Sequence, residues 1–356
     1  MSVLRTGLPQ RLGPAAAVGR TWTQRRGAGA TAVHRPVVPS SAWLPTAPCS
    51  PQICVTSVRS LSDVPRAVLR IAAMLAVLLF GIMLMPVFGS VPAARRDALV
   101  RWWSRTIVQA AGVRVRITGT AAPTGGMLLV ANHISWLDIP LLAAVRPARM
   151  LAKAEIRRWP VAGGLTAASG ALFIERDRLR ALPETVTRIA EAMRAGAAVV
   201  AFPEGSTWCG RAQGPFRRAV FQAALDAGVP VQPVRLHYRF DNGPSSTAPA
   251  FVGEDSLLSS MWRVVTARGL VAEVEIRDEI PAGSHPDRRA LAHAAQPGMM
   301  GAELGWAHAA LISEESRARA LAVGAGTEGL PAADYGDYAG YAEGRLARPA
   351  IRASRR

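Results

Sequence analysis

A regular alternation of two kinds of segment between residues 114 and 280 constrains the fold of this chain more than any other feature. Short apolar runs that are typical of strands are separated by segments with helical spacing, such as 184–195 and 217–227. This alternation predicts an α/β sheet covered by helices. Strands are expected at 114–118, 127–131, 149–152, 171–175, 197–202, 231–238 and 271–276.

The chain divides into four regions by composition. Residues 1–65 are rich in Arg, Pro, Ala, Ser and Thr without a sustained period, which predicts a disordered basic N-terminal extension; a transit peptide is the alternative. Residues 66–113 hold an expected membrane anchor and an amphipathic helix. The folded domain is expected at 114–297, closed by a helix around 286–296, and residues 298–356 are expected to form a C-terminal helix and a flexible tail.

Residues 71–90 carry no charge over twenty positions, which is long enough for a helix to cross the hydrocarbon core of a membrane. Arginines flank this stretch on both sides, so the positive-inside rule does not decide its orientation. Pro86 is expected to kink the helix near its end, which leaves a re-entrant or surface-lying anchor open. The amphipathic segment 97–113 carries Trp102 and Trp103, which suits either the membrane interface or packing against the domain.

The basic charge of the chain, +17 overall, lies mostly at its N-terminal end. Residues 1–119 contain 15 arginines against two acids, or +13, whereas 120–280 carry 18 basic residues against 15 acids, or +3. Basic residues beside an apolar segment suit an anionic membrane surface. A nucleic-acid partner is not expected, because its basic side chains would lie on the folded domain among aromatic residues.

Two residue types are scarce. The three cysteines, Cys49, Cys54 and Cys209, show no metal-ligand spacing and no disulfide framework, so neither a metal site nor a disulfide is expected, and a reducing setting is the default. Of the 42 basic residues only Lys153 is a lysine, which marks a position of interest.

His133 and Asp138 follow the predicted strand 127–131, five positions apart. On a continuous helix this spacing separates two side chains by roughly 140°, so they meet only if the chain turns between strand and helix. Ser135 offers that turn as a helix N-cap, with Asp138 three residues later as in a capping box. Asp138 is therefore either a structural acid at a helix start, a carboxylate that orients His133, or both.

Two further segments end expected strands with polar residues. Arg176 closes "ALFIER" and has the shape to grip a phosphate, although a lone arginine is more often simply solvated. Glu204 and Gly205 close "VVAFPEG", where a glycine lets backbone approach a ligand and the acid is predicted to accept hydrogen bonds from substrate hydroxyls. An ordinary turn is the alternative for this second segment.

Four blocks together resemble the lysophosphatidic acid acyltransferase family of glycerolipid acyltransferases. The family pattern N-H-x-x-x-x-D, or HX4D, is matched by Asn132, His133 and Asp138, and G-x-x-F-I-x-R is matched by residues 170–176. The blocks F-P-E-G and V-P-V-x-P-V are matched by residues 202–205 and 229–234. The resemblance covers about 110 residues and implies a mixed sheet flanked by helices, preceded by a hydrophobic membrane-anchor helix.

The resemblance implies an enzyme that moves an acyl group from acyl-CoA or an acyl carrier protein, without a further cofactor or metal, to the sn-2 hydroxyl of lysophosphatidic acid. His133 would act as the base and Asp138 as its orienting carboxylate, while Glu204 and Gly205 would lie at the acceptor and Lys153 and Arg176 would hold its phosphate. It also implies a lipid partner and a place at the plasma membrane, with the catalytic domain on the cytoplasmic face.

Two departures from the family pattern concern the acceptor. Ser206, Thr207 and Trp208 follow Gly205, where many members carry an arginine, so Arg211 or Arg217 is the candidate to replace it. Ala219 follows "PFRR" where a glycine is common. Both departures keep another acceptor open, such as a lyso-ornithine lipid.

Two alternatives change the class of function. One is a hydrolase that uses Cys209 or Ser206 as its nucleophile, although the G-x-S-x-G elbow of serine hydrolases is absent. The other is a membrane-anchored binding protein without catalytic activity, against which the presence of both His133 and Asp138 argues.

Overall fold

The chain was analysed as a computed structural model. The structure describes residues 47–56, 61–158, 163–164, 166, 169–175, 178–241 and 243–296. The helix and tail expected at 298–356 and most of the N-terminal extension lie outside these ranges.

The seven expected strands all form, and they make one seven-stranded sheet in the order β1-β7-β6-β2-β5-β3-β4. Its only antiparallel pair in the described ranges is β6 with β7, and the other neighbours run parallel, which confirms a mixed sheet. The strands are β1 (Arg114–Thr118), β2 (Met127–Ala131), β3 (Arg149–Lys153), β4 (Leu172–Ile174), β5 (Ala198–Ala201), β6 (Val231–Phe240) and β7 (Leu270–Ile276).

Strand β2 lies at the centre of the fold and is buried along its whole length. Its side chains alternate between two apolar clusters, with Leu129 in one and Leu128 and Val130 in the other, because successive residues of a strand face opposite sides of the sheet. Helices therefore cover both faces. One face carries α6 (Leu182–Arg194), α7 (Ala219–Ala227) and α9 (Arg288–Ala295), and the other carries α3 (Ala93–Ala110), α4 (Asp138–Val145) and α8 (Leu257–Thr266).

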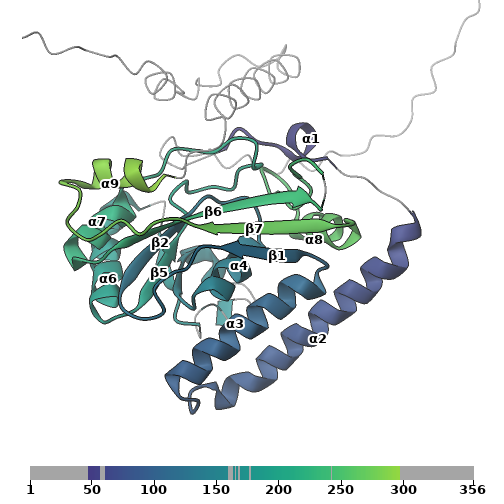
Figure 1. Ribbon diagram of the computed structural model, residues 1–356, viewed down its shortest axis with the longest axis horizontal. Helices are drawn as coiled ribbons and strands as arrows, with labels where there is room; N and C mark the ends of the chain where they lie inside the picture. The colour runs from purple at the N-terminus through teal and green to yellow at the C-terminus, as the bar shows by residue number, and fades with distance from the viewer. Residues whose placement is uncertain are drawn as a thin grey trace, which may run out of the picture. The chain divides into compact units, whose positions relative to one another are not determined.

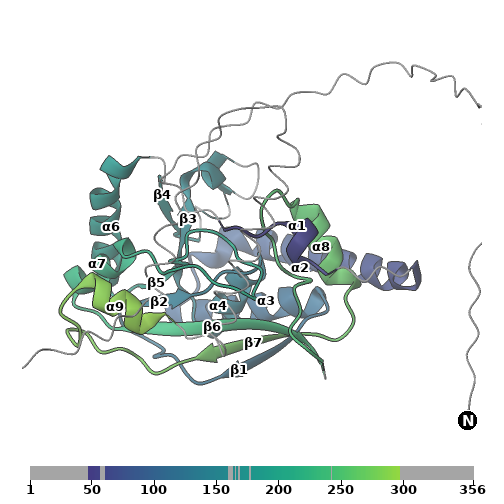
Figure 2. The same cartoon turned by 90° about the horizontal axis from the view of Figure 1, so that it is seen from above.

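The helices of the first face match the segments expected from helical spacing. Helix α6 packs against α7 and α7 against α9, as Figure 2 shows. Short 3-10 turns complete the described chain at η1 (Leu61–Asp63), η2 (Ala154–Arg158) and η3 (Leu179–Ala181).

Helix α2 (Val64–Phe88) contains most of the uncharged stretch and continues two residues beyond Pro86. By length and composition it can cross a membrane, and only 6% of its most apolar window is buried. Its exposed apolar side chains would meet water in the absence of a membrane, and such a patch marks an interaction surface. They are Val64, Val68, Leu69, Leu75, Leu79, Phe80, Met83 and Val87.

Helices α2 and α3 lie side by side as two long rods (Figure 1). The Nε1–H of Trp103 donates to the carbonyl of Val77 over 2.9 Å, and its indole lies so close to Gly81 that a Cβ there would clash. Val108 of α3 is fully buried in the domain core, whereas Trp102 is 53% exposed. The amphipathic segment thus packs on the domain and still presents one tryptophan outward.

Residues 47–56, here called the N-terminal strap, correct the expectation that residues 1–65 form a disordered extension. The strap includes a short helix, α1 (Pro51–Cys54), and ends at Thr56, whose backbone N–H donates to Thr247 Oγ1 over 3.1 Å. Composition missed the strap because its burial depends on two cysteines and on contacts with residues about 200 positions away.

Candidate active site

His133 and Asp138 meet at the carboxyl end of β2, as the turn between strand and helix allows. His133 Nδ1 lies 2.8 Å from Asp138 Oδ2, and α4 begins at Asp138 itself. The His133 side chain is 20% exposed and that of Asp138 is fully buried, so solvent reaches the imidazole and not the carboxylate.

Four donors surround the Asp138 carboxylate. Oδ2 accepts from the backbone N–H groups of Ile134 (2.6 Å) and Ser135 (2.8 Å) as well as from His133, and Oδ1 accepts from the hydroxyl of Tyr238 (2.5 Å). A carboxylate only accepts hydrogen bonds, so His133 donates from Nδ1, and in a neutral imidazole this tautomer leaves the lone pair on Nε2.

Tyr238 comes from β6, a hundred residues away, and sequence reasoning missed it. Burial, followed by the charge of Asp138, raises the pKa of Tyr238 well above its usual value of 10.0, so the phenol stays neutral and donates. In the sequence Tyr238 is recognisable only as a residue of an apolar strand. Its proximity to Asp138 depends on the pairing of β6 with β2, which appears only in the fold.

The expected N-cap needs correction. The N-cap of α4 is Leu137 without a side-chain hydrogen bond, and the Ser135 hydroxyl accepts from Leu137 N–H over 3.3 Å. Asp138 reaches back to Ser135 N–H, so only the acidic half of the capping box forms. The Asp138 carboxylate therefore both closes the turn and holds the imidazole, so the structural role and the orienting role expected for this residue occur together.

Glu204 lies beside this turn, because β5 is the parallel neighbour of β2. Its Oε2 accepts the backbone N–H of His133 over 2.7 Å, and its Oε1 accepts that of Gly214 over 3.1 Å. The residue is 3% exposed, and burial raises its pKa well above 4.5 despite the two N–H donors. Glu204 thus links the segments that follow β2 and β5. Its contact with substrate hydroxyls stays a prediction.

Three groups of His133 are therefore held by the protein. Besides Nδ1 and the backbone N–H, its carbonyl accepts from Trp208 N–H over 2.7 Å. The Phe202 ring stacks on the imidazole, with centroids 4.0 Å apart and planes 14° apart. The remaining polar atom, Nε2, has no hydrogen-bond partner among the residues that the structure describes.

Asn132 extends the pairing of β2 with β6 by one residue. Its side-chain amide donates to the carbonyl of Leu236 over 3.0 Å and accepts from Leu236 N–H over 2.8 Å. The position of the following histidine is thereby fixed relative to β6.

The predicted cations that the structure describes lie at the surface. Lys153 ends β3, which runs parallel to β5, so it lies at the same edge of the sheet as His133 and is exposed. Arg211 and Arg217 are exposed as well, in the chain that follows Glu204. Arg176 lies outside the described residues.

The predicted nucleophiles of a hydrolase are not presented to solvent. Cys209 is fully buried, and the hydroxyl oxygen of Ser206 is buried too. Gly205 adopts φ +77°, which favours glycine, and its N–H donates to Phe202 O over 3.1 Å, so this N–H is engaged within the turn.

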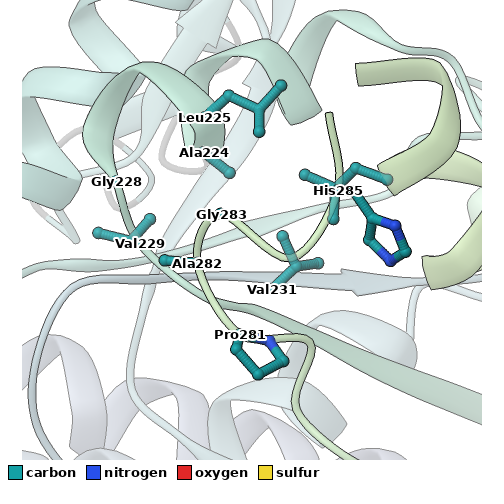
Figure 3. Close-up of a pocket in the computed structure, with 10 residues that line it drawn as sticks. Ala224, Leu225, Gly228, Val229, Val231, Pro281, Ala282, Gly283 and His285 are labelled. Carbon is teal, nitrogen blue, oxygen red and sulfur yellow. The ribbon is translucent and has the colours of Figure 1, made fainter. Parts of the chain in front are cut away.

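A pocket also opens at the opposite edge of the sheet, between the end of α7 and residues 281–285 (Figure 3). It is lined by apolar side chains and His285 and contains none of the residues predicted for the site. A smaller pocket at the edge that carries His133 is lined by Asn132, Gly210, Ala212, Gln213 and residues 235–237.

Comparison with known proteins identifies the family of the chain. A family model described as "Acyltransferase" matches residues 113–237. A lyso-ornithine lipid O-acyltransferase of Pseudomonas aeruginosa is 41% identical over 203 residues, which cover 56% of this chain and 76% of the relative. A 1-acyl-sn-glycerol-3-phosphate acyltransferase of Neisseria meningitidis is 34% identical over 227 residues, covering 63% and 88% respectively.

The fold has a counterpart among solved structures. The crystal structure of PlsC, the 1-acyl-sn-glycerophosphate acyltransferase of Thermotoga maritima, superposes with a TM-score of 0.50 at 15% identity and covers 74% of this chain and 98% of its own. The chain is an acyltransferase and belongs to the lysophosphatidic acid acyltransferase family, whose relatives named here act on either 1-acyl-sn-glycerol 3-phosphate or a lyso-ornithine lipid.

Proposed function

We propose that this enzyme transfers a fatty acyl group from acyl-CoA or an acyl carrier protein to the sn-2 hydroxyl of lysophosphatidic acid and so makes phosphatidic acid. The observation that carries the proposal is the base, His133 Nε2, directed away from a buried carboxylate at a sheet edge that also carries the exposed residue Lys153.

The chemistry follows from the protonation of the pair. A hydroxyl is a weak nucleophile at neutral pH, so His133 Nε2 takes its proton as its oxygen attacks the thioester carbonyl. Asp138 holds the Nδ1–H and stabilises the imidazolium that forms. The tetrahedral intermediate then collapses, the carbon–sulfur bond breaks, and the imidazolium returns the proton to the leaving thiolate. No acyl-enzyme intermediate is needed.

The phosphate of the acceptor calls for cations near the base. Lys153, Arg211 and Arg217 are exposed and supply them, and Arg176 is a further candidate from the family pattern. A phosphate monoester takes several such contacts, because each oxygen accepts charge-assisted hydrogen bonds.

Helix α2 supplies access to the lipid. Its exposed apolar side chains would hold the domain at the bilayer, where both substrate and product reside. We place the catalytic domain on the cytoplasmic face of the plasma membrane, the side on which acyl-CoA and acyl carrier protein are found.

A lyso-ornithine lipid is the second candidate acceptor, and two observations favour it. The Pseudomonas aeruginosa relative carries that name. In addition, the turn after Glu204 presents Ser206, Thr207 and a buried Trp208 where an arginine is common in the family, so one phosphate contact is missing.

An acyltransferase assay separates the two acceptors. Full-length enzyme in membranes is supplied with labelled acyl-CoA or acyl carrier protein and with lysophosphatidic acid or a lyso-ornithine lipid at equal concentrations. We expect kcat/KM to be higher for lysophosphatidic acid. A preference for the lyso-ornithine lipid would replace the proposed acceptor and leave the chemistry intact.

The His133→Ala variant tests the chemistry itself. Loss of a general base costs about 10²–10⁴-fold in kcat, and the variant should bind acceptor with an unchanged KM. His285→Ala is the matched control, because His285 lines the pocket at the other edge of the sheet and should leave turnover unchanged. Full activity of His133→Ala with either acceptor would show that the mechanism is wrong.

A further inference from the structure

The three cysteines of the chain come together in the fold, although nothing in their spacing predicts it. The Sγ atoms of Cys49, Cys54 and Cys209 all lie within 4.8 Å of one another, and the residues are 3%, 0% and 0% exposed. They come from two distant parts of the chain, since two belong to the N-terminal strap and Cys209 follows the F-P-E-G turn.

The distances suit a shared metal ion. Three sulfur ligands at about 2.3 Å from a common zinc ion lie roughly 3.8 Å apart in tetrahedral geometry. The thiols therefore need to approach by no more than about 1 Å, which falls within side-chain rotation. A buried cysteine also packs well as a small apolar residue, but that role does not require all three thiols of a chain to converge.

The strap that carries two of these thiols is held in place by its backbone. The carbonyl of Cys49 approaches Gly253 so closely that an added Cβ would lie 3.0 Å from it, and Thr56 bonds to Thr247. The thiols are thus presented from fixed backbone positions, as a pre-formed ligand set requires.

A cysteine ligates a metal ion as the thiolate, so a bound cation would displace the protons of the three thiols.

We propose that Cys49, Cys54 and Cys209 form a binding site for a thiophilic metal ion, which fastens the N-terminal strap to the loop that supports the catalytic histidine. Thiolate ligands select soft cations such as zinc(II) and copper(I). Zinc(II) is the first candidate, because three thiolates leave a net charge of −1 around a divalent ion and −2 around a monovalent one, and buried net charge is unfavourable. Water would complete a tetrahedral zinc site, since no fourth His, Cys, Asp or Glu joins the group within the described ranges.

The location links this site to the catalytic one. Cys209 follows Trp208, whose N–H donates to the carbonyl of His133 over 2.7 Å, and Gly210 lies against Ile134. A metal ion there would stabilise the strap and the backbone around His133 without touching substrate. The inference stands independently of the acceptor and of the proposed mechanism.

Metal content and spectroscopy test the site. The full-length chain is purified in detergent without a histidine tag, kept reduced with a phosphine, and loaded with zinc(II) or copper(I) in separate samples. We expect one ion per chain by elemental analysis, and cobalt(II) in place of zinc should give thiolate-to-metal charge-transfer absorption. Bound metal should raise the unfolding temperature and protect residues 47–56 from proteolysis.

Serine variants supply the comparison. Three nearly isosteric variants each remove one direct ligand: Cys49→Ser, Cys54→Ser and Cys209→Ser. Loss of an outer-shell partner lowers metal affinity by about 10–100-fold, so loss of a direct ligand should lower zinc affinity by more than that. Ile53→Ala removes strap packing and leaves the thiols, so it should still bind one ion. Circular dichroism confirms that each variant is folded.

Three outcomes would overturn the proposal. One is a folded, fully reduced chain that binds neither ion at one per chain. A second is a triple serine variant that binds zinc as tightly as the unaltered chain. The third is a disulfide between two of the cysteines in protein isolated anaerobically, which would make the cluster a redox pair instead of a metal site.

Discussion

Two parts of the same sheet edge are built in opposite ways. Around Asp138 every donor is supplied from the interior, by two backbone N–H groups, an imidazole and a buried phenol. The cations proposed to hold the acceptor, Lys153, Arg211 and Arg217, are exposed on the loops and strand end around it. On the proposed mechanism, the chemical step depends on buried and mutually fixed groups, whereas recognition of the headgroup depends on side chains that water reaches.

On the proposed function, this difference would allow the acceptor to change without a change in the geometry around His133. Exposed ion pairs contribute little each, so replacing one changes affinity modestly. Replacing a member of a buried network leaves unsatisfied groups behind and has a large effect. The following predictions test whether this division holds.

The largest effect is expected from Asp138→Asn. An amide places an NH2 group where donors already point, so His133 loses the acceptor that fixes its tautomer, and kcat should fall by about 10³–10⁴-fold. Steady-state kinetics measures it. Asp241→Asn removes the same charge from an exposed ion pair with Arg114 and should retain activity. Comparable rates for the two variants would contradict the division between buried and exposed groups.

Tyr238→Phe should have an intermediate effect. It removes one of four donors and keeps the ring, and a hydrogen bond to a charged group is worth about 1.5–3 kcal/mol. We expect the free energy of unfolding to fall by about that amount and kcat to fall about tenfold. Acceptor KM should not change, because the phenol touches only Asp138 and its surroundings. An altered KM with unchanged kcat would assign Tyr238 to substrate binding instead.

Lys153→Ala should act on binding alone. An exposed ion pair is worth up to about 1 kcal/mol, so the KM for lysophosphatidic acid should rise about fivefold while kcat stays constant. The effect should be absent with an acceptor that lacks a phosphate. Arg194→Ala is the control, because Arg194 precedes β5 and lies toward the opposite edge of the sheet. Equal effects of the two variants would exclude a specific contact at Lys153.

The smallest effect concerns the pH dependence of stability. Because the pKa of Glu204 is raised above 4.5 in the fold, the folded chain keeps a proton that the unfolded chain releases above that pH. Stability should therefore fall as the pH rises from 4.5 toward the folded pKa. In Glu204→Gln this slope should be absent, which unfolding temperatures in a series of buffers from pH 4.5 upward would reveal. Parallel curves for both proteins would show that Glu204 does not titrate in this way.

The sheet and the contact between His133 and Asp138 were predictable because they depend on local pattern. Apolar runs mark β2 and β5 directly, and the five-residue spacing of His133 and Asp138 requires only one turn. Tyr238 was missed because its contact with Asp138 depends on the pairing of strands a hundred residues apart. The two backbone N–H groups that the Glu204 side chain accepts were not predictable either, because they come from loops after two different strands.

The strap and the cysteine cluster were not predictable for a related reason. Their residues lie in a segment whose composition resembles a disordered tail, and composition does not report a partner about 150 residues away. Cys54 and Cys209 become neighbours only once the loop after β5 has formed. Long-range contacts of this kind leave no periodic trace in a sequence.

The backbone N–H, the carbonyl and Nδ1 of His133 all form hydrogen bonds within the protein. Nε2 is therefore the one polar atom of this residue that is left for a substrate. If His133 is the base, acceptor range should be alterable by substituting the exposed side chains of Arg211 and Arg217 while keeping the backbone of the loop that carries them, because that backbone contacts His133 and Glu204. Libraries confined to those two side chains should yield active variants far more often than libraries that include residues 132–138.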